Sequence, residues 1–177
     1  LRVPRLRPSG IFRSHDSFFH RFAALLKRIP FAFPLACPDA GFAPVYVGDV
    51  TNAFMQALTR PTAFGRRYDL CGPTVYTLQE LVEYTARVIG VKRRVIGLND
   101  KLSHLQARIF EWLPGKPFSL DNYHSLQTDS VCRGCIFPTD FAIQPASVES
   151  IVPTYLDAHS SEDHYKKYRR SVSAINK

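Results

Sequence analysis

The sequence predicts an α/β fold with an incomplete sheet, and three observations support this prediction. Short runs rich in β-branched and aromatic residues alternate with segments of helical periodicity. About four strands are predicted, which is few for a complete doubly wound sheet in a chain of 177 residues. The composition, 45% hydrophobic and 21% charged, is that of a globular domain with one sizeable core.

The predicted N-terminal elements are a short strand and an amphipathic helix. The strand covers Val3–Leu6 and leads into a turn at residues 8–10. Apolar residues spaced three and four apart predict a helix from Phe18 to Arg28, with Asp16 or Ser17 as its N-cap. The apolar stripe of this helix is expected to enter the core, and it consists of Phe18, Phe19, Phe22, Leu25, Leu26 and Ile29.

A loop, two strands and a helix are predicted in the middle of the chain. Residues 30–44 contain four prolines and are expected to form a loop. The strand Phe42–Val47 precedes a helix over Val50–Leu58. Asp49 is predicted to cap this helix, because a carboxylate can accept hydrogen bonds from the free N–H groups of the first turn. Arg66–Leu70 is predicted to be the next strand.

The second half of the chain is predicted to be mainly helical. Thr77 and Glu80 have the spacing of a capping box, and Gly90 is placed to end the helix that begins there. The further predicted elements are a strand over Lys92–Ile96, helices over Asp100–Leu113 and 119–127, an irregular segment over 128–144, and a last helix that has Pro145 in its first turn and runs to Asp157.

The net charge of +8 is concentrated at the two ends of the chain. Residues 1–28 carry +6, residues 29–157 carry −1 and residues 158–177 carry +3. A nucleic-acid-binding domain would show a basic face with interleaved aromatic residues, so no nucleic acid is expected as a partner. Basic ends fit contact with an anionic membrane, an acidic partner or a phosphate.

Three segments resemble the extended and atypical short-chain dehydrogenase/reductase superfamily, the NAD-dependent epimerase/dehydratase group. Residues 6–12 are similar to its late Rossmann strand and exit loop, residues 44–50 to its strand-to-helix step, and residues 68–81 to its strand, "G-G-P" turn and capped helix. Residues 16–26 and 151–156 are most similar to the NDUFA-nine branch of respiratory complex I accessory subunits.

This resemblance implies that residues 1–157 form the C-terminal portion of an NAD(P)-binding Rossmann-like domain with a small α/β substrate-side subdomain. Residues 158–177 would be a basic tail. The implied function is assembly or stability of the respiratory NADH:quinone oxidoreductase, or quinone metabolism. The implied partner is a subunit of that complex or the N-terminal half of the family domain. The implied location is cytoplasmic or peripheral at the inner membrane, on the matrix side in a eukaryote.

The resemblance also assigns a cofactor loop. In the family the loop after the late strand lies against the nicotinamide end of NAD or NADP, and this maps onto Pro8, Ser9, Gly10, Ile11 and Phe12. A proline-fixed turn beside a glycine lets the backbone approach a flat ring closely. The next residue, an arginine, is expected either to meet a phosphate or to be solvated.

The motifs for phosphate binding and catalysis in this family do not occur in the sequence. The glycines never form the G-x-x-G-x-x-G or G-x-G-x-x-G loop, and no tyrosine is followed four residues later by lysine. We therefore expect weak or no binding of NAD(P) by this chain alone. No catalytic residue is assigned, and whether the chain takes part in an enzyme is left open.

The cysteines and histidines do not form a recognised site. Cys132 and Cys135 form a C-x-x-C pair, while Cys37 and Cys71 have no partner at metal-ligand spacing. We expect this pair to be two small apolar residues with free thiols in a reducing compartment rather than a metal or redox site, although four cysteines could also form two disulfides. The histidines, among them His20 and His124, are expected to be packing or surface residues, and Asp69 a turn residue.

Two alternative functions remain open at this point. The chain could be a fragment of a catalytic sugar-nucleotide epimerase or dehydratase, which a Tyr-x-x-x-Lys motif upstream in the reading frame would favour. It could also be a non-enzymatic interaction module. Such a module would use an apolar helical stripe left partly exposed, consisting of Leu102, Leu105, Ile109, Trp112 and Leu113.

Overall fold

A computed structural model describes residues 3–13, 17–112, 118–132 and 138–156 of the chain. The elements in chain order are β1 (Arg5–Pro8), β2 (Ile11–Phe12), α1 (Ser17–Arg28), β3 (Ala32–Leu35), β4 (Gly41–Phe42), β5 (Val45–Tyr46), α2 (Val47–Thr59), η1 (Pro61–Ala63), β6 (Arg67–Leu70), β7 (Tyr76–Thr77), α3 (Leu78–Val88), β8 (Arg94–Gly97), α4 (Asp100–Phe110), α5 (Leu120–Leu126) and η2 (Thr139–Phe141). A last helix covers 148–156.

The strands of the described residues form four separate two-stranded pairs. The pairs β1–β6, β2–β5 and β3–β8 are parallel, and the pair β4–β7 is antiparallel. Parallel pairing requires a crossover connection, and helices supply these crossovers here. The prediction of an α/β fold with an incomplete sheet is confirmed, although the described chain holds more strands than the sequence predicted.

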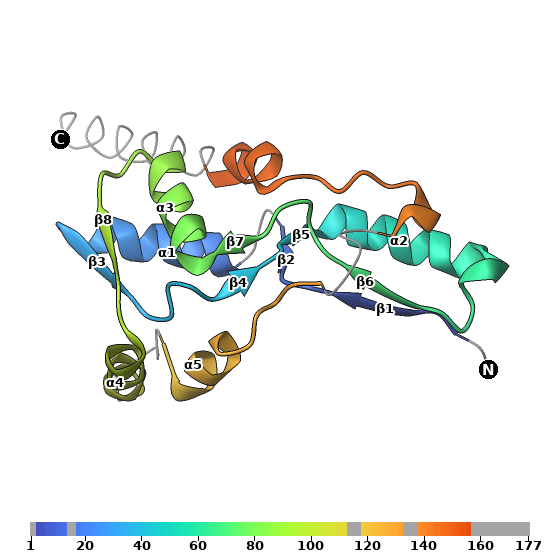
Figure 1. Cartoon of the computed structure of the whole chain (residues 1–177). Helices are drawn as coiled ribbons and strands as arrows, with labels where there is room; N and C mark the ends of the chain where they lie inside the picture. Colours follow the sequence, from blue (N-terminus) through green and yellow to red (C-terminus); the bar gives the residue numbers. More distant parts are fainter. Residues whose placement is uncertain (1–2, 14–16, 113–117, 133–137, 157–177) are drawn as a thin grey trace, which may run out of the picture.

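The pairs are arranged along an elongated molecule with two lobes. In Figure 1 the first lobe consists of β1, β6 and α2, and the second lobe consists of α1, α3, α4, α5, β3 and β8. The short pairs β2–β5 and β4–β7 lie between the two lobes. The first lobe has its own buried cluster beneath α2, around Val45, Ala53 and Leu70. The second lobe has two clusters that share α1 and α3.

Helix α1 confirms the predicted aromatic stripe. Phe19 is 1% exposed, and its ring centroid lies 5.1 Å from that of Phe18. Phe18 also packs against Phe22 at 4.9 Å, and Phe22 packs against Phe33 of β3 at 6.2 Å. Buried aromatic rings in edge-to-face contact stabilise a core beyond the area that they bury. The stripe therefore fixes α1 against β3 within the second lobe.

The predicted capping box at the start of α3 is confirmed. The Glu80 backbone N–H donates to Thr77 Oγ1 at 3.2 Å, and the Thr77 backbone N–H donates to Glu80 Oε2 at 2.7 Å. At the other end Gly90 follows the C-cap with φ of +68°, a conformation that glycine adopts without strain.

The predicted role of Asp49 as an N-cap is wrong. Helix α2 begins at Val47, with Tyr46 in the N-cap position and no side-chain cap, so Asp49 lies within the first helical turn. The Asp49 carboxylate instead accepts a hydrogen bond from the backbone N–H of Ala146 at 2.7 Å. The prediction had this carboxylate accept hydrogen bonds from the first turn of its own helix. It accepts one instead from Ala146, which is far away in the sequence.

Other element boundaries also differ from the predictions. Residues 30–44 are not one loop, because β3 and β4 lie within them. Pro34 is tolerated in β3 because β3 pairs with β8 on one side only, and a proline at a free edge removes no ladder hydrogen bond. The last helix begins at 148, so Pro145 precedes it. Ser147 Oγ accepts a hydrogen bond from the N–H of Ser150 there.

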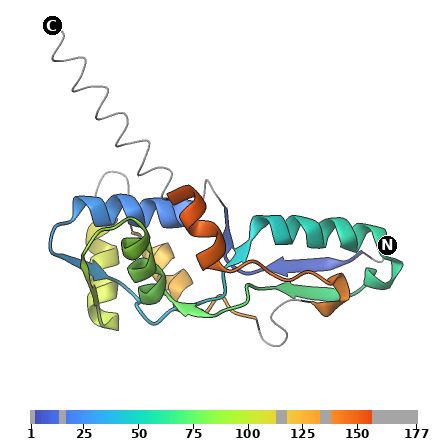
Figure 2. The ribbon, with the colours of Figure 1, turned by 90° about the horizontal axis from the view of Figure 1, so that it is seen from above.

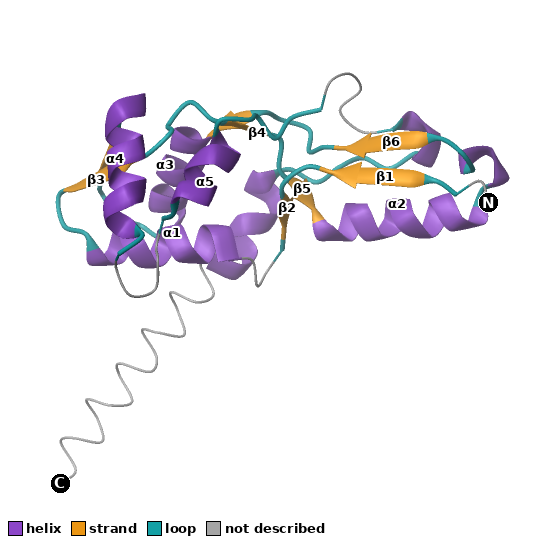
Figure 3. Ribbon diagram, turned by 90° about the horizontal axis from the view of Figure 1, so that it is seen from below, coloured by secondary structure: helices purple, strands orange, loops and turns teal. Residues whose placement is uncertain are grey.

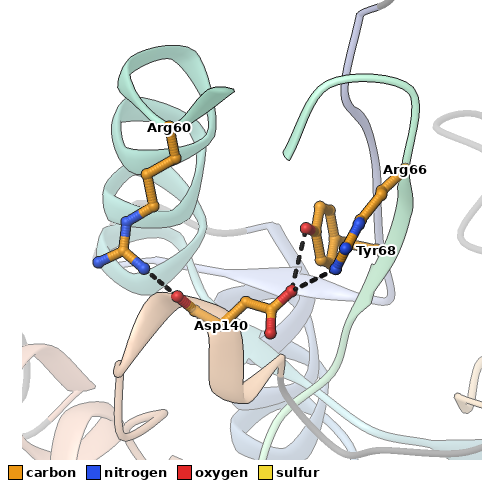
Figure 4. A network of polar contacts seen from close by, with 4 residues as sticks. All are labelled: Arg60, Arg66, Tyr68 and Asp140. Carbon is orange, nitrogen blue, oxygen red and sulfur yellow. Dashed lines mark hydrogen bonds and ion pairs between the residues drawn. The ribbon is translucent and has the colours of Figure 1, made fainter. Parts of the chain in front are cut away.

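The segment 138–156 connects the two lobes, and we call it the strap. Figure 2 shows it running from the far end of α2 to the top of the second lobe. At the first end, Asp140 Oδ2 accepts a hydrogen bond from the Tyr68 hydroxyl at 3.1 Å and pairs with Arg66 at 3.4 Å (Figure 4). Arg60 donates to the Asp140 backbone carbonyl.

The middle and the second end of the strap are fixed in the same way. Asp49 of α2 holds the strap at Ala146, as described above. The Tyr76 hydroxyl of β7 donates to Glu149 Oε1 at 2.7 Å. Burial and this hydrogen bond raise the pKa of Tyr76 to about 12. The strap therefore contacts both lobes through side chains that lie far away in the sequence.

Some predictions lie outside the described residues. They concern the cap of α1 at Asp16, the contribution of Leu113 to the exposed stripe, the second cysteine of the C-x-x-C pair, the end of the last helix at Asp157 and the domain boundary there, and the basic tail over 158–177. Ser17, the other candidate for the cap, is instead the first helical residue of α1.

The hydrogen bond between Asp49 and Ala146 predicts a measurable contribution to stability. Replacing Asp49 by alanine leaves a half-buried backbone N–H without its acceptor, so the free energy of unfolding should fall by about 1 kcal/mol. Urea denaturation measures this change. Asp49→Asn, which keeps an acceptor oxygen, should cost less. An equal loss in both variants would mean that the charge of Asp49, rather than this hydrogen bond, is what matters.

Candidate functional site

A pocket of about 400 Å³ lies where the parallel strands β1 and β6 end. Figure 3 shows these strands side by side, both pointing toward the junction of the two lobes. Ligands of open α/β folds bind outside the carboxyl ends of parallel strands. The floor of the pocket, from the strand ends, consists of Arg7, Pro8, Ser9, Asp69 and Cys71, and its outer wall consists of Asp129, Ser130, Val131 and Cys132.

The floor is fixed by backbone hydrogen bonds between three chain segments. The N–H of Ser9 donates to the carbonyl of Leu70 at 3.0 Å, and the N–H of Val45 donates to the carbonyl of Gly10 at 2.9 Å. The N–H of Gly72 donates to the carbonyl of Ala43 at 3.2 Å, and the Ser9 hydroxyl donates to the same carbonyl. Residues 9–10, 43–45 and 70–72 therefore hold one another in place.

Gly72 is required at this crossing because two backbones touch. A Cβ atom at position 72 would lie 1.7 Å from the carbonyl oxygen of Pro44 and 2.8 Å from its carbonyl carbon. Neither atom belongs to a flexible side chain, so a larger residue would push the two segments apart. The turn after β6 thus needs glycine for close approach of the backbone.

The outer wall is held against residues 41–43 by three hydrogen bonds. The N–H of Ser130 donates to the carbonyl of Gly41 at 2.8 Å, and the N–H of Ala43 donates to the carbonyl of Ser130 at 3.0 Å. The N–H of Gly41 donates to Asp129 Oδ1 at 2.8 Å. The outer wall therefore lies alongside residues 41–43, which are β4 and the residue after it.

A disulfide joins the outer wall to the floor. Cys71 and Cys132 are bonded, with their Cα atoms 6.1 Å apart. The expectation of a free thiol at Cys132 is wrong, because folding brings it together with Cys71, which is 61 residues away in the sequence. Cys37 is a free thiol.

The residues of the predicted cofactor loop lie in different environments: some line the pocket, one is exposed and one is in the core. Pro8 and Ser9 line the pocket, and Gly10 uses its carbonyl to bind Val45. Ile11 lies in β2 with 47% of its surface exposed. Phe12 is 2% exposed and packs against Phe19 and Tyr46 in the core. Only the first part of the loop therefore borders the pocket, while Arg13 is exposed.

The pocket carries charges of both signs. Arg7 and Asp69 are register partners in β1 and β6, so their side chains share one face of the strand pair. No ion pair joins them in the part of the chain that the structure describes, where Arg66 pairs with Asp140 instead. A guanidinium binds anionic groups, and a carboxylate accepts hydrogen bonds from hydroxyls. This arrangement suits binding of a ligand that carries both kinds of group.

Asp69 is a pocket residue that the sequence analysis did not identify. It lies inside β6 and lines the pocket, so the prediction of a turn residue is wrong. The rule that ligands bind at the carboxyl ends of parallel strands could have drawn attention to Asp69 and Arg7. No sequence signal pointed to the outer wall, because its partners lie at residues 41–43.

The histidines in the described residues serve packing, as predicted. The ring of His20 stacks on Tyr155 at 5.6 Å, and His104 and His124 contact Tyr123 at 5.3 and 5.4 Å. Within the described ranges, no group of three or more His, Cys, Asp or Glu could hold a metal ion. No helix of the same ranges is long and apolar enough to span a bilayer.

Comparison with known sequences finds relatives among respiratory subunits. No family model matches the chain. The mouse protein named NADH dehydrogenase [ubiquinone] 1 alpha subcomplex subunit 9, mitochondrial, is 32% identical over 96% of the chain and 44% of the relative. The Neurospora crassa NADH-ubiquinone oxidoreductase 40 kDa subunit, mitochondrial, is 26% identical over 90% of the chain and 42% of the relative. The chain thus spans less than half the length of these relatives.

Comparison with solved structures identifies the fold. A nucleoside-diphosphate-sugar epimerase from Staphylococcus aureus superposes with a TM-score of 0.58 at 16% identity, over 82% of this chain and 50% of that one. The protein gox2253 superposes with a TM-score of 0.56 at 17% identity, over 87% and 48%. The expected Rossmann-like fold of the epimerase group is confirmed, and identities this low establish the fold alone.

The close contact at Gly72 predicts that this position does not accept a side chain. Gly72→Ala should lower the free energy of unfolding by about 3 kcal/mol, because Pro44 and the turn after β6 must separate. Thermal or urea denaturation measures the loss. Gly10→Ala is the matched control, since a Cβ there would lie 4.0 Å from Phe42 Cδ1, in ordinary contact. Similar stabilities for the two variants would contradict the proposed crossing.

Proposed function

This chain is a homologue of the mitochondrial complex I subunits named above, and on that premise we propose that it is the C-terminal portion of an NAD(P)-binding, short-chain dehydrogenase-like protein. The proposed role is assembly or stability of the respiratory NADH:ubiquinone oxidoreductase. The observation that carries the proposal is the 32% identity to the mouse subunit over 96% of the chain. The proposed location is peripheral, on the matrix side of the inner membrane.

The pocket supports the cofactor part of the proposal. We propose that Pro8 and Ser9 face the nicotinamide end of NAD or NADP, and that Arg7 meets an anionic group of the ligand. The buried Phe12 contributes by fixing the end of the loop in the core rather than by touching the ligand. The glycine-rich cradle that holds the pyrophosphate in the family has no counterpart in this sequence.

We propose that helix α4 carries the surface that docks on the respiratory complex. We call this surface the α4 stripe, and its described members are Leu102, Leu105 and Ile109 of α4, exposed by 47%, 50% and 52%, and Trp112 just after the helix, exposed by 89%. Aromatic and aliphatic residues of this kind form the anchors of protein interfaces. The relatives are named as subunits of a large assembly, which supports a protein surface as the occupant.

Helix α4 is held firmly while its stripe stays exposed. Its opposite face is buried at Ser103 and Ala107 and packs toward α5. The Tyr123 hydroxyl of α5 donates to Asp100 Oδ1 at 2.6 Å, and this bond together with burial raises the pKa of Tyr123 to about 12. Gln106 donates to the Pro34 carbonyl. The stripe is therefore presented on a fixed support, as a docking surface requires.

The alternative of a sugar-nucleotide epimerase rests on the fold alone. The epimerase superposition has 16% identity, whereas the sequence relatives reported above are respiratory subunits. A Tyr-x-x-x-Lys motif in the reading frame upstream of Leu1 would favour the epimerase. The alternative of a free interaction module predicts a monomer that binds neither nucleotide nor the respiratory complex.

The proposed role predicts association with the respiratory complex through the α4 stripe. The tagged full-length protein, expressed in its own source cells, should migrate with NADH dehydrogenase activity on native gels. Leu105→Asp and Ile109→Asp should each release it, because a charge in the contact must be desolvated. Met55→Asp, on α2 with 62% of its surface exposed, is the control and should have no effect.

Two results would contradict this docking proposal. Migration as a free protein in the unaltered form would exclude a stable place in the complex. The stripe variants could also stay associated with the complex but lose binding to anionic lipid vesicles. That result would mean that the stripe contacts the membrane and not the complex. Lys101 and Arg108 beside the stripe would suit such a membrane contact.

The proposed cofactor role predicts weak nucleotide binding by the chain alone. Titration of the isolated 177-residue chain with NADH or NADPH in a calorimeter should show no micromolar binding, because no glycine-rich loop holds the pyrophosphate. The full-length protein should bind more tightly, and Arg7→Ala should weaken that binding. Micromolar affinity of the isolated chain would mean that residues other than a glycine loop supply the phosphate site.

A further inference from the structure

We propose that Cys71–Cys132 is a redox-active disulfide, and that its reduction releases the outer wall of the pocket. Both cysteines line the pocket, and their bond is the covalent tie in the described residues between the floor and the wall. The resemblance and the comparisons assign no redox role to either cysteine. Breaking the bond would change access to the ends of β1 and β6.

The two cysteines belong to segments that differ in burial and in how firmly the rest of the fold holds them. Cys71 is 2% exposed and follows β6 directly, next to the close contact between Gly72 and Pro44. Cys132 is half-buried and belongs to the wall segment. When the bond breaks, Cys71 therefore stays in the core, while the wall keeps, among the described residues, its hydrogen bonds with residues 41–43.

Those remaining interactions are few. They are the two backbone hydrogen bonds of Ser130 with Gly41 and Ala43, and the hydrogen bond from Gly41 to the exposed Asp129. Only the bond to Asp129 is exposed and contributes little to stability, whereas Ala43 is 2% exposed and Ser130 is half-buried, so their backbone bonds are the main noncovalent hold on the wall. A disulfide that closes a 61-residue loop restricts the chain far more than these bonds do. Reduction is therefore expected to open the wall locally.

The reaction is a thiol–disulfide exchange with a dithiol reductant, either a small molecule or a thioredoxin-type protein. A thiolate of the reductant attacks Cys132 Sγ through the pocket, a mixed disulfide forms, and Cys71 leaves as a thiolate that takes up a proton. The second thiol of the reductant then displaces Cys132. Two electrons and two protons pass to the protein, and the reductant becomes a disulfide.

Cys37 is not expected to take part in this exchange. Burial is the main cause that raises the pKa of the Cys37 thiol, and the nearby charge of Asp100 adds to it. A thiol with a raised pKa is a poor nucleophile at neutral pH. Where thiols are kept reduced, a disulfide is usually catalytic or redox-sensing, so the argument for a switch rests on the proposed mitochondrial location.

The test combines disulfide mapping with amide hydrogen exchange on the full chain. Mapping of the oxidised protein should find Cys71 linked to Cys132. Adding dithiothreitol should then raise the exchange rates of the Ser130 and Ala43 amides by about tenfold or more. Amides of α3 should keep their rates. The double variant with Cys71→Ser and Cys132→Ser should exchange rapidly at these positions with or without dithiothreitol, and Cys37→Ser should respond as the unaltered chain does.

Three results would overturn the proposal. They are a bond from Cys71 to another cysteine, unchanged exchange of the wall after reduction, or faster exchange throughout α3, which would make the disulfide a structural brace of the whole fold. These readouts do not involve the respiratory complex. If the disulfide responds as expected while the protein fails to migrate with the complex, only the proposed function falls.

Discussion

The site depends on one backbone contact, where Gly72 meets the carbonyl of Pro44. This contact lets the turn after β6 lie directly on the segment that leads into β5, and the hydrogen bonds of residues 9–10 fasten the end of β1 to both. Three chain segments from different parts of the sequence are thereby fixed within hydrogen-bonding distance. The floor of the pocket, the start of α2 and the first part of the predicted cofactor loop all take their positions from this crossing.

The two lobes are joined by the strap, whose ends are buried in their apolar clusters: Phe141 lies in the cluster of the first lobe, and Val148 and Val152 lie in a cluster of the second. Polar contacts supplement this burial. Arg66 and Asp140 are both largely exposed, so their ion pair adds little to stability. The half-buried bond of Asp49 to the strap adds more, because it satisfies a backbone N–H withdrawn from water, while the bond from Tyr76 to Glu149 is exposed. The strap therefore acts through several separate points of contact along its length, which together define how α2 lies relative to the second lobe.

Local patterns were predicted well from the sequence, and long-range contacts were not. The capping box at Thr77 and the aromatic stripe of α1 depend on residues within a few positions of one another, so their spacing was sufficient. Asp49 was assigned to the wrong partner because its hydrogen-bond donor lies in the strap. The strand containing Pro34 was missed because only its pairing with β8 makes it a strand. The pairing of Cys71 with Cys132 and the outer wall of the pocket likewise exist only after folding.

The position of the strap near the end of the described chain bears on the order of events during synthesis. A ribosome delivers α2 and β7 long before residues 138–156, so neither lobe can engage the strap until almost all of the described chain has emerged. Each lobe has an apolar cluster of its own and can collapse earlier. Until the strap arrives, the apolar surfaces that receive Phe141 and Val152 in the two lobes therefore stay uncovered.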